Sequence, residues 1–269
     1  MEHSSFKEKV VIITGASSGI GRELAFQLAS QGAWLSLAAR STERLEMVKR
    51  ECERLGGKAI GIPTDVGELV QCEALIRQTV DRYTRLDMLV NNAGITMFAN
   101  FEDVRDPGIF EKLMRINYLG SVYCTSYALP YLKQTEGRIV GISSLTGKTG
   151  VPTRSGYAAS KHAMAGFFDS LRIEVAQYKI SVTMIYPGFV ATAVREQALG
   201  EDGKSVGRST VKESEVMPVD QCARIILRAA TQRKREVVMT LRGKIGMWLK
   251  LIAPGFVDRI ARRAIHSGR

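Results

Sequence analysis

The chain has 269 residues, of which 45% are hydrophobic and 24% are charged, and its formal net charge is +11. This composition is typical of a globular protein and excludes collagen-like, disordered and disulfide-scaffold proteins. No apolar run approaches the roughly 20 residues of a membrane-spanning helix, and the polar first ten residues lead us to expect no secretory signal or N-terminal anchor. The four cysteines have no metal-binding or redox spacing, which favours a reducing compartment, the cytoplasm, and predicts no metal site.

The positive charge is concentrated near the C-terminal end. Residues 233–269 contain ten Lys or Arg and two acidic residues, so this segment carries +8 and the other 232 residues carry +3. A basic protein raises the hypothesis of nucleic-acid binding. Because most of the chain is nearly balanced and no RNA- or DNA-binding motif is present, we expect no nucleic-acid partner.

Short apolar runs alternate with segments of helical periodicity along the chain. In chain order, the pattern predicts a strand at 10–14, a helix at 22–31, a strand at 34–39, a helix at 42–55, a strand at 58–62, a helix at 68–83, a strand at 86–90, a helix at 110–132, a strand at 138–142, a helix at 157–177, a strand at 180–185, a helix from 218 to about 231 and a strand at 237–240. The expected fold class is therefore α/β: a doubly wound (Rossmann) parallel sheet of about seven strands with helices on both faces. A C-terminal amphipathic extension follows it.

A glycine-rich turn, Thr14-Gly-Ala-Ser-Ser-Gly-Ile-Gly21, lies between the first predicted strand and the first predicted helix. Glycines let the backbone approach a pyrophosphate, and the helix N-terminus offers free N–H groups and the positive end of its dipole. The spacing differs from the Gly-x-Gly-x-x-Gly of the standard dinucleotide site. A tight turn without a ligand is the alternative interpretation.

The second predicted strand ends in Ala38-Ala39-Arg40, at the position where NAD-binding proteins carry an acidic residue that holds the ribose 2′-hydroxyl. Arg40 instead suits a 2′-phosphate through charge-assisted hydrogen bonds, and Ser41 and Thr42 can add hydroxyl donors. We therefore expect NADP(H) as the cofactor. A solvated charge at the start of a helix is the alternative for Arg40.

Further motifs follow the glycine turn. They are Asn91-Asn-Ala-Gly94, Asn117, Ser143-Ser144, Tyr157-Ala-Ala-Ser-Lys161 and Pro187-Gly188. In this order and spacing the sequence resembles the short-chain dehydrogenase/reductase family from residue 10 to about 192, and its closest likeness is to the membrane-associated dehydrogenase/reductase branch. The resemblance implies interconversion of a ketone or aldehyde with an alcohol by hydride transfer. It also implies a homodimer or homotetramer assembled through the helices at about 110–132 and 157–177.

Carbonyl reduction requires a hydride donor, a group that stabilises the developing oxyanion and a proton donor. Tyr157 and Lys161 are four residues apart on one helix face, so the ammonium can lower the pKa of the tyrosine and favour its role as acid/base. Ser144 is expected to hydrogen-bond the substrate oxygen, with Ser143 as the competing serine. By resemblance, Asn117 fixes a water that relays protons to Lys161, and Lys161 holds the nicotinamide ribose.

The resemblance also implies which residues contact the cofactor. Asp65 and Val66 would hold the adenine, although Asp65 could instead cap the following helix. The residues predicted to bind NADP(H) are Gly15, Ser17, Ser18, Gly19, Ile20, Gly21, Arg40, Asp65, Val66, Asn92, Ala93, Gly94, Tyr157, Lys161, Pro187, Gly188, Val190 and Thr192. Ser144 and Tyr157 are predicted to bind the substrate.

The chain divides into a body and an extension. We expect residues 1–242 to form one catalytic domain with a mobile substrate lid at about 190–217. Residues 243–269 are expected to form a basic amphipathic extension, because apolar and basic residues repeat with helical spacing on both sides of Pro254. Such a segment can lie on a membrane surface. The alternative is that it packs on protein, where it would cover a subunit boundary or the mouth of the substrate cleft.

Taken together, these features predict an NADP(H)-dependent carbonyl reductase or alcohol dehydrogenase. The expected substrate is lipophilic, lipid-like or steroid-like. A non-catalytic NADP-binding regulatory protein is the alternative, since one fold can host several functions.

Overall fold

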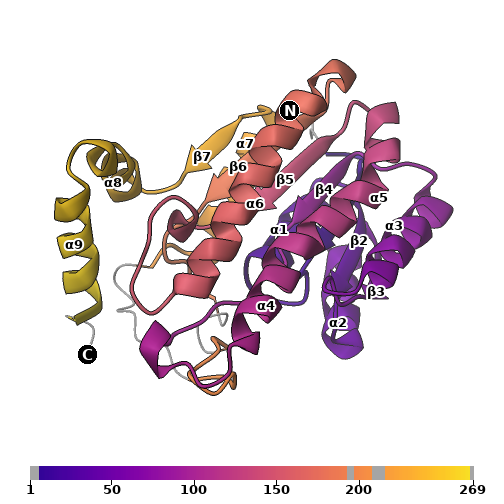
Figure 1. Ribbon diagram of the computed structural model, residues 1–269. Coiled ribbons are helices and arrows are strands. Elements are labelled where there is room, and N and C mark those ends of the chain that lie inside the picture. Colours follow the sequence, from indigo (N-terminus) through magenta and orange to yellow (C-terminus); the bar gives the residue numbers. More distant parts are fainter. Residues whose placement is uncertain (1–5, 193–196, 208–215, 267–269) are drawn as a thin grey trace.

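The computed structural model describes residues 6–192, 197–207 and 216–266. Within them, seven parallel strands form one sheet in the order β3-β2-β1-β4-β5-β6-β7 (Figure 1). The order reverses between β1 and β4, and in α/β proteins such a reversal leaves a crevice for ligands at the carboxyl ends of the strands. The strands are β1 (Val10–Thr14), β2 (Trp34–Ala39), β3 (Lys58–Pro63), β4 (Met88–Asn91), β5 (Arg138–Ile142), β6 (Ser181–Tyr186) and β7 (Glu236–Val238).

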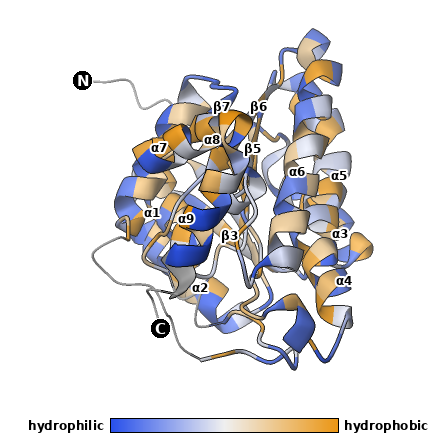
Figure 2. Ribbon diagram, turned by 60° about the vertical axis from the view of Figure 1, so that its left-hand side comes forward, coloured by the Kyte–Doolittle hydropathy of each residue, from blue (hydrophilic) through white to orange (hydrophobic). Residues whose placement is uncertain are grey.

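Helices cover both faces of the sheet (Figure 2). α1 (Gly19–Ala29), α2 (Thr42–Arg54) and α7 (Val219–Thr231) pack on one face, and α3 (Leu69–Tyr83), α5 (Gly120–Gln134) and α6 (Ser155–Glu174) pack on the other. Alternate residues of a strand point to opposite faces, so in β1 Val11 and Ile13 join one core while Val10 and Ile12 join the other. All five residues of β1 are buried, as a strand covered on both sides requires. The predicted fold class is confirmed.

The helix predicted at 110–132 is divided in the structure. It consists of α4 (Gly108–Met114), a π-helical turn at Arg115–Leu119, and α5. A π turn accommodates one extra residue per turn and occurs frequently at functional sites. Here it contains the buried Asn117, which hydrophobic periodicity could not distinguish from the residues of a regular helix. The ends of the other predicted elements agree with the structure within three residues.

Two helices, α8 (Leu241–Ile252) and α9 (Pro254–His266), follow β7 and form a hairpin beside the sheet, drawn in yellow in Figure 1. The strand predicted at 237–240 ends early because Thr240 caps α8. Its hydroxyl accepts the Gly243 N–H at 3.0 Å. None of the described helices is long and apolar enough to cross a bilayer.

Candidate active site

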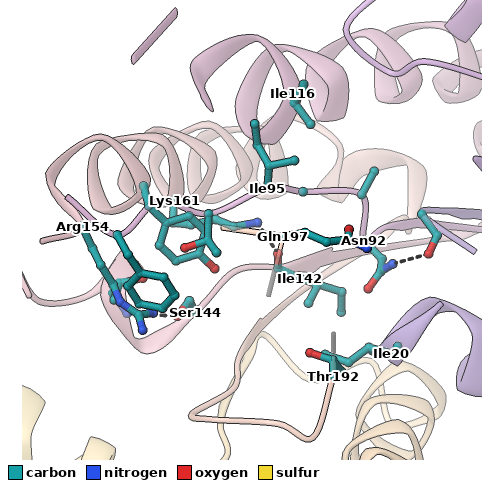
Figure 3. Close-up of a pocket in the computed structure, with 18 of the residues that line it drawn as sticks. Ile20, Asn92, Ile95, Ile116, Ile142, Ser144, Arg154, Lys161, Thr192 and Gln197 are labelled. Atoms are coloured by element: carbon teal, nitrogen blue, oxygen red, sulfur yellow. Dashed lines mark hydrogen bonds between the residues drawn. The ribbon is translucent and has the colours of Figure 1, made fainter. Parts of the chain in front are cut away.

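A cleft of about 1830 Å³ opens at the carboxyl ends of the strands. Its walls come from the segments that follow each of the strands β1 to β6, together with α6 (Figure 3). The structure brings nearly all of the sequence-predicted site residues to these walls. Gly21 and Asn117 are not on them, because Gly21 lies beneath the glycine-rich turn and Asn117 is buried behind Ile95.

The glycine-rich turn forms the wall at the start of α1. Gly15 and Gly19 have φ angles of 66° and 53°, in the left-handed region that favours glycine. Gly21 cannot carry a side chain without a shift, since its Cβ would lie 2.3 Å from the Gly15 carbonyl oxygen. The Asn92 side-chain amide donates to the Thr14 carbonyl oxygen at 2.8 Å and ties the turn to the segment after β4. The start of α1 is therefore held open toward the cleft as a site for an anionic group.

Two arginines lie at the carboxyl end of β2. Arg40 directly follows the strand and Arg44 lies in the first turn of α2, and both are exposed and line the cleft. The Ser41 hydroxyl accepts the Arg44 N–H at 3.4 Å and caps α2. Sequence reasoning identified Arg40 but missed Arg44. Arg40 precedes the N-cap residue Ser41, so helical spacing does not relate the two side chains, and only the structure brings both to the cleft.

Asp65 and Val66 follow β3, the strand next to β2, and also line the cleft. The alternative that Asp65 caps α3 is wrong, because Glu68 occupies the N-cap position. Asp65 Oδ1 instead accepts the Gly67 N–H at 2.9 Å, in a turn that precedes the helix. The carboxylate is half-buried and belongs to the cleft wall.

A serine, a tyrosine and a lysine meet where β5 ends and α6 begins. Tyr157 and Lys161 lie about one turn apart on α6, and both line the cleft with Ser144. The buried Ser143 hydroxyl donates to the Lys161 carbonyl oxygen at 3.4 Å, whereas Ser144 is half-buried and its side chain acts to lower the pKa of Tyr157. The geometry therefore favours Ser144 over Ser143 as the serine that meets a ligand.

The Lys161 side chain is buried, with 3% of the residue exposed. Its ammonium donates to the Ile142 carbonyl oxygen at 2.9 Å and lies 5.9 Å from the centre of the Tyr157 ring. Gly94 approaches the same atom, since a Cβ at Gly94 would lie 3.4 Å from Lys161 Nζ and 3.1 Å from Asn117 Oδ1. The ammonium is therefore enclosed between the segments that follow β4 and β5.

Burial governs the ionisation of both α6 residues. Burial lowers the pKa of Lys161 from 10.5 to about 8 and raises the pKa of Tyr157. The neighbouring Ser144 side chain, the charge of Arg154 and the Thr146 side chain oppose the rise in the pKa of Tyr157. The sequence predicted that Lys161 would lower this pKa. In the structure desolvation dominates and the net shift is upward.

Asn117 joins the π-helical turn to its surroundings. Its side-chain amide donates to the Ile95 carbonyl oxygen and to the Ser160 hydroxyl, both at 2.9 Å, and its Oδ1 accepts the Ile95 N–H at 2.8 Å. Both amide protons are therefore used in linking the segment after β4 to α6. A water fixed by Asn117 would have to bind one of its oxygens.

The segment after β6 closes the cleft opposite α6. Pro187, Gly188, Val190 and Thr192 line it, and the Thr192 methyl would lie 3.0 Å from a Cβ at Gly19. This wall therefore packs directly on the glycine-rich turn, and Figure 3 shows Thr192 beside Ile20.

The predicted lid at about 190–217 is described in part, since residues 193–196 and 208–215 lie outside the described residues. Leu199 is buried, its N–H donates to the Thr96 carbonyl oxygen and its own carbonyl oxygen accepts the Phe98 N–H, both at 2.9 Å. Backbone pairing therefore holds this part of the segment against the cleft wall after β4.

An aromatic clamp around Arg154 is a feature that sequence reasoning missed. The guanidinium carbon lies 4.3 Å from the centre of the Phe98 ring and 5.6 Å from that of Phe189, and all three residues line the cleft. Arg154 lies close to Ser144 in Figure 3. The three residues come from the segments after β4, before α6 and after β6, so no sequence spacing could reveal their contact.

Neither the cysteines nor the possible metal ligands of the described residues form a second candidate site. Cys52, Cys72, Cys124 and Cys222 are all buried and free. No group of His, Cys, Asp and Glu in the part of the chain that the structure describes could hold a metal ion.

Comparison with known proteins gives consistent results. A family model described as "short chain dehydrogenase" matches residues 9–202. A "Dehydrogenase/reductase SDR family protein 7-like" of Dictyostelium discoideum is 36% identical over 98% of this chain and 84% of its own length. An "11-beta-hydroxysteroid dehydrogenase A" of Sesamum indicum is 37% identical over 94% of this chain and 74% of its own length.

A solved structure shares the fold. It is an alcohol dehydrogenase from the archaeon Thermococcus sibiricus, complexed with 5-hydroxy-NADP, with a TM-score of 0.74 and 27% identity. The alignment covers 86% of this chain and 95% of that chain.

The family match covers most of the chain, and the relatives and the solved structure extend the similarity to nearly its whole length. The resemblance predicted from the motifs is thereby confirmed. The chain is an oxidoreductase acting on CH–OH groups, and it belongs to the short-chain dehydrogenase/reductase family.

Proposed function

We propose that this protein uses NADP(H) to interconvert a ketone or aldehyde with an alcohol, with Tyr157 as the acid/base. One observation carries the proposal. Ser144, Tyr157 and Lys161 line the same cleft as the glycine-rich turn. An acid/base group and a dinucleotide cradle thus share one continuous cavity.

The residues of the cleft fit NADP(H). The left-handed Gly15 and Gly19 leave room for a pyrophosphate at the start of α1. Arg40 and Arg44 supply two positive charges where an NAD site carries an acidic residue, and this favours a 2′-phosphate. The residues that would hold the rest of the cofactor are Ser17, Ser18, Ile20, Asp65, Val66, Asn92, Ala93, Gly94, Pro187, Gly188, Val190 and Thr192. When bound, the nicotinamide supplies or accepts the hydride.

The chain's own residues handle the proton. Tyr157 donates a proton to the carbonyl oxygen during reduction and takes one from the alcohol during oxidation. The Ser144 hydroxyl, which lines the cleft with the tyrosine, stabilises negative charge on the substrate oxygen. Lys161 has a pKa of about 8, close enough to neutral pH to resupply Tyr157 with a proton through intervening hydroxyl groups or water. A water fixed by Asn117 is the proposed continuation of this relay.

The alternative is a non-catalytic NADP-binding regulatory protein. Such a protein needs the glycine-rich turn and Arg40. Binding of the cofactor alone does not require a buried ammonium, and burying a charge destabilises the fold because the charge loses its contact with water. The burial of Lys161 beside Tyr157 therefore favours an enzyme.

We further propose that the substrate is lipophilic, lipid-like or steroid-like. Leu145, Val151 and Phe189 line the cleft that also contains Ser144 and Tyr157, and apolar walls of this kind bind ligands mainly by burial. Relatives whose names include 11-beta-hydroxysteroid dehydrogenase support this class of substrate.

The assembly is also a proposal. Residues 1–242 form the catalytic domain with its lid at about 190–217, and the protein works in the cytoplasm as a homodimer or homotetramer. The outer surfaces of α5 and α6 are the proposed subunit interface, where Ile173 is 76% exposed in the single chain. Residues 243–269 provide peripheral contact with a membrane.

Tyr157→Phe tests the proposed reaction. Removing the hydroxyl removes the proton donor without emptying the ring position, so carbonyl reduction should fall at least about a hundredfold. NADPH affinity should stay within about twofold of wild type. NADPH absorbance with a panel of ketones measures the first quantity, and fluorescence titration measures the second. Wild-type turnover in this variant would contradict the assignment and favour the regulatory alternative.

Replacing Arg40 and Arg44 with alanine tests cofactor choice. Each arginine can make a charge-assisted bond to a 2′-phosphate, so the double variant should bind NADPH at least about tenfold more weakly and NADH nearly unchanged. Arg50→Ala is the matched control, because Arg50 is an exposed arginine of α2 that pairs with Glu46. Equal losses for both cofactors would refute a 2′-phosphate site.

Lys161→Met tests the buried charge through stability. The lysine has an ordinary pKa of 10.5 and a folded-state pKa of about 8, so between these pH values the unfolded chain binds more protons than the folded chain. Raising the pH through this range should therefore add up to about 3 kcal/mol to the unfolding free energy of wild type relative to the variant. Urea unfolding at several pH values measures the difference, and Lys234→Met should follow wild type. Parallel curves for wild type and Lys161→Met would show that the ammonium is not desolvated.

Gly166→Arg tests the proposed subunit interface. Gly166 is exposed in the middle of α6, and a Cβ there meets nothing within 4 Å, so the single chain tolerates a side chain at this position. An arginine should leave the circular dichroism unchanged but lower the oligomeric mass measured by light scattering, because it places a long charged group in the interface. Val70→Arg on α3 is the control. An unchanged mass for Gly166→Arg, or a monomeric wild type, would contradict the interface.

A further inference from the structure

The apolar stripe of α8 faces solvent. Leu241, Ile245, Trp248 and Ile252 follow helical spacing, and 72%, 55%, 71% and 83% of their surfaces are exposed. Amphipathic helices normally bury such a stripe against the protein. α8 and α9 together contain seven of the fourteen exposed large hydrophobic residues in the described chain. Half of the exposed apolar side chains therefore belong to one hairpin.

The opposite side of α8 fixes this orientation. A Cβ at Gly243 would lie 2.5 Å from the Leu145 side chain, so the helix approaches the segment after β5 closely. Met247 packs against the core of the sheet, and the Lys250 ammonium donates to the Lys148 carbonyl oxygen at 3.2 Å. Rotating α8 to bury its apolar stripe would break these contacts, so the stripe stays exposed.

The second helix continues the same surface. Phe256 and Ile260 are each 49% exposed on α9, and Arg259 and Arg263 are exposed between and beyond them. Figure 2 shows hydrophobic and strongly hydrophilic residues together on this helix. We name the exposed side chains of both helices the hairpin surface, which consists of Leu241, Ile245, Trp248, Leu251, Ile252, Phe256 and Ile260 with the basic residues Lys244, Arg259 and Arg263.

We propose that the hairpin surface docks the enzyme on an anionic lipid bilayer, so that lipophilic substrate passes from the membrane into the cleft. Apolar side chains flanked by cations match the acyl region and the anionic headgroup region of such a bilayer. The apolar groups enter the acyl region and the cations remain at anionic headgroups. The net charge of +5 on the α8–α9 hairpin complements these headgroups.

The same charge argues against a second copy as the occupant. A symmetric contact between two hairpin surfaces would bring together two hairpins that each carry a net charge of +5, and like charges in contact are unfavourable. An anionic bilayer covers the same apolar area and neutralises the cations. The charge therefore selects lipid over self-association.

The hairpin surface adjoins the cleft, which links docking to substrate entry. Ala261 of α9 lines the cleft, and Leu145, which α8 contacts at Gly243, follows the proposed catalytic Ser144. A docked hairpin would therefore bring the mouth of the cleft to the lipid surface. This second step rests on the proposed function, in particular on a lipophilic substrate.

Vesicle sedimentation of the full chain tests the docking. The vesicles contain phosphatidylcholine alone, or equal parts of phosphatidylcholine and phosphatidylglycerol. We expect binding to the anionic vesicles that weakens with salt. Trp248→Ser with Ile252→Ser, and separately Lys244→Glu with Arg263→Glu, should each reduce the bound fraction at least about tenfold. Met47→Ser with Val70→Ser is the matched control, because these two residues are 66% and 69% exposed on other helices and should not matter.

Tryptophan fluorescence gives an independent readout. The chain has two tryptophans, so Trp34→Phe leaves Trp248 as the only reporter. Its emission should shift to shorter wavelength with anionic vesicles, as expected for an indole that leaves water for the lipid interface.

Activity separates this inference from the proposed function. The Trp248→Ser/Ile252→Ser variant should reduce a water-soluble ketone at the wild-type rate, and its KM for a ketone dissolved in anionic vesicles should rise at least about tenfold. If neither wild type nor any variant reduces a ketone, the proposed function would be overturned, and vesicle sedimentation would still test the docking. Equal sedimentation of wild type and the Trp248→Ser/Ile252→Ser variant with anionic vesicles would overturn the docking. The docking would also be overturned if wild type did not bind vesicles and this variant had a lower oligomeric mass than wild type, since the hairpin surface would then be a contact between subunits.

Discussion

The candidate site depends on one buried interaction, the hydrogen bond from the Lys161 ammonium to the carbonyl oxygen of Ile142. This bond attaches α6 to the end of β5, and Ser143 adds a second link from its hydroxyl to the Lys161 backbone. Burying a charge is costly unless hydrogen bonds compensate for the lost water. The ammonium is therefore held at low solvent exposure with a lowered pKa. Tyr157 lies about one turn away on the same helix and lines the cleft.

The rest of the site is assembled around this lysine by backbone contacts. Gly94 approaches the ammonium closely, and Asn117, in the π-helical turn, binds both the N–H and the carbonyl oxygen of Ile95. Asn92 then ties the same segment to the glycine-rich turn. The proposed cofactor site and the proposed acid/base group are thus parts of one hydrogen-bonded unit, so a change at either is expected to disturb the geometry of the other.

Charge and apolar surface are distributed between two regions with different roles. The body is nearly neutral overall, and two of its exposed cations, Arg40 and Arg44, line the cleft where we propose that the 2′-phosphate binds. The hairpin of α8 and α9 carries a net charge of +5 together with exposed apolar side chains. Under the two proposals the catalytic residues and the docking residues are separate, so binding to a surface can vary without changing the reacting groups.

The sequence by itself determined the α/β fold and the family, and nearly all of the site residues that it predicted line the cleft, because strand periodicity, the glycine spacing and the Tyr157–Lys161 interval are all local patterns. It placed Asn117 in a regular helix and overlooked Arg44 and the Phe98–Arg154–Phe189 clamp. It also predicted the wrong sign for the shift in the pKa of Tyr157. Only the tertiary structure decided these features and the outward orientation of α8. Desolvation, contacts between distant segments and the rotation of a helix about its axis depend on which atoms surround a residue, and local spacing does not contain that information.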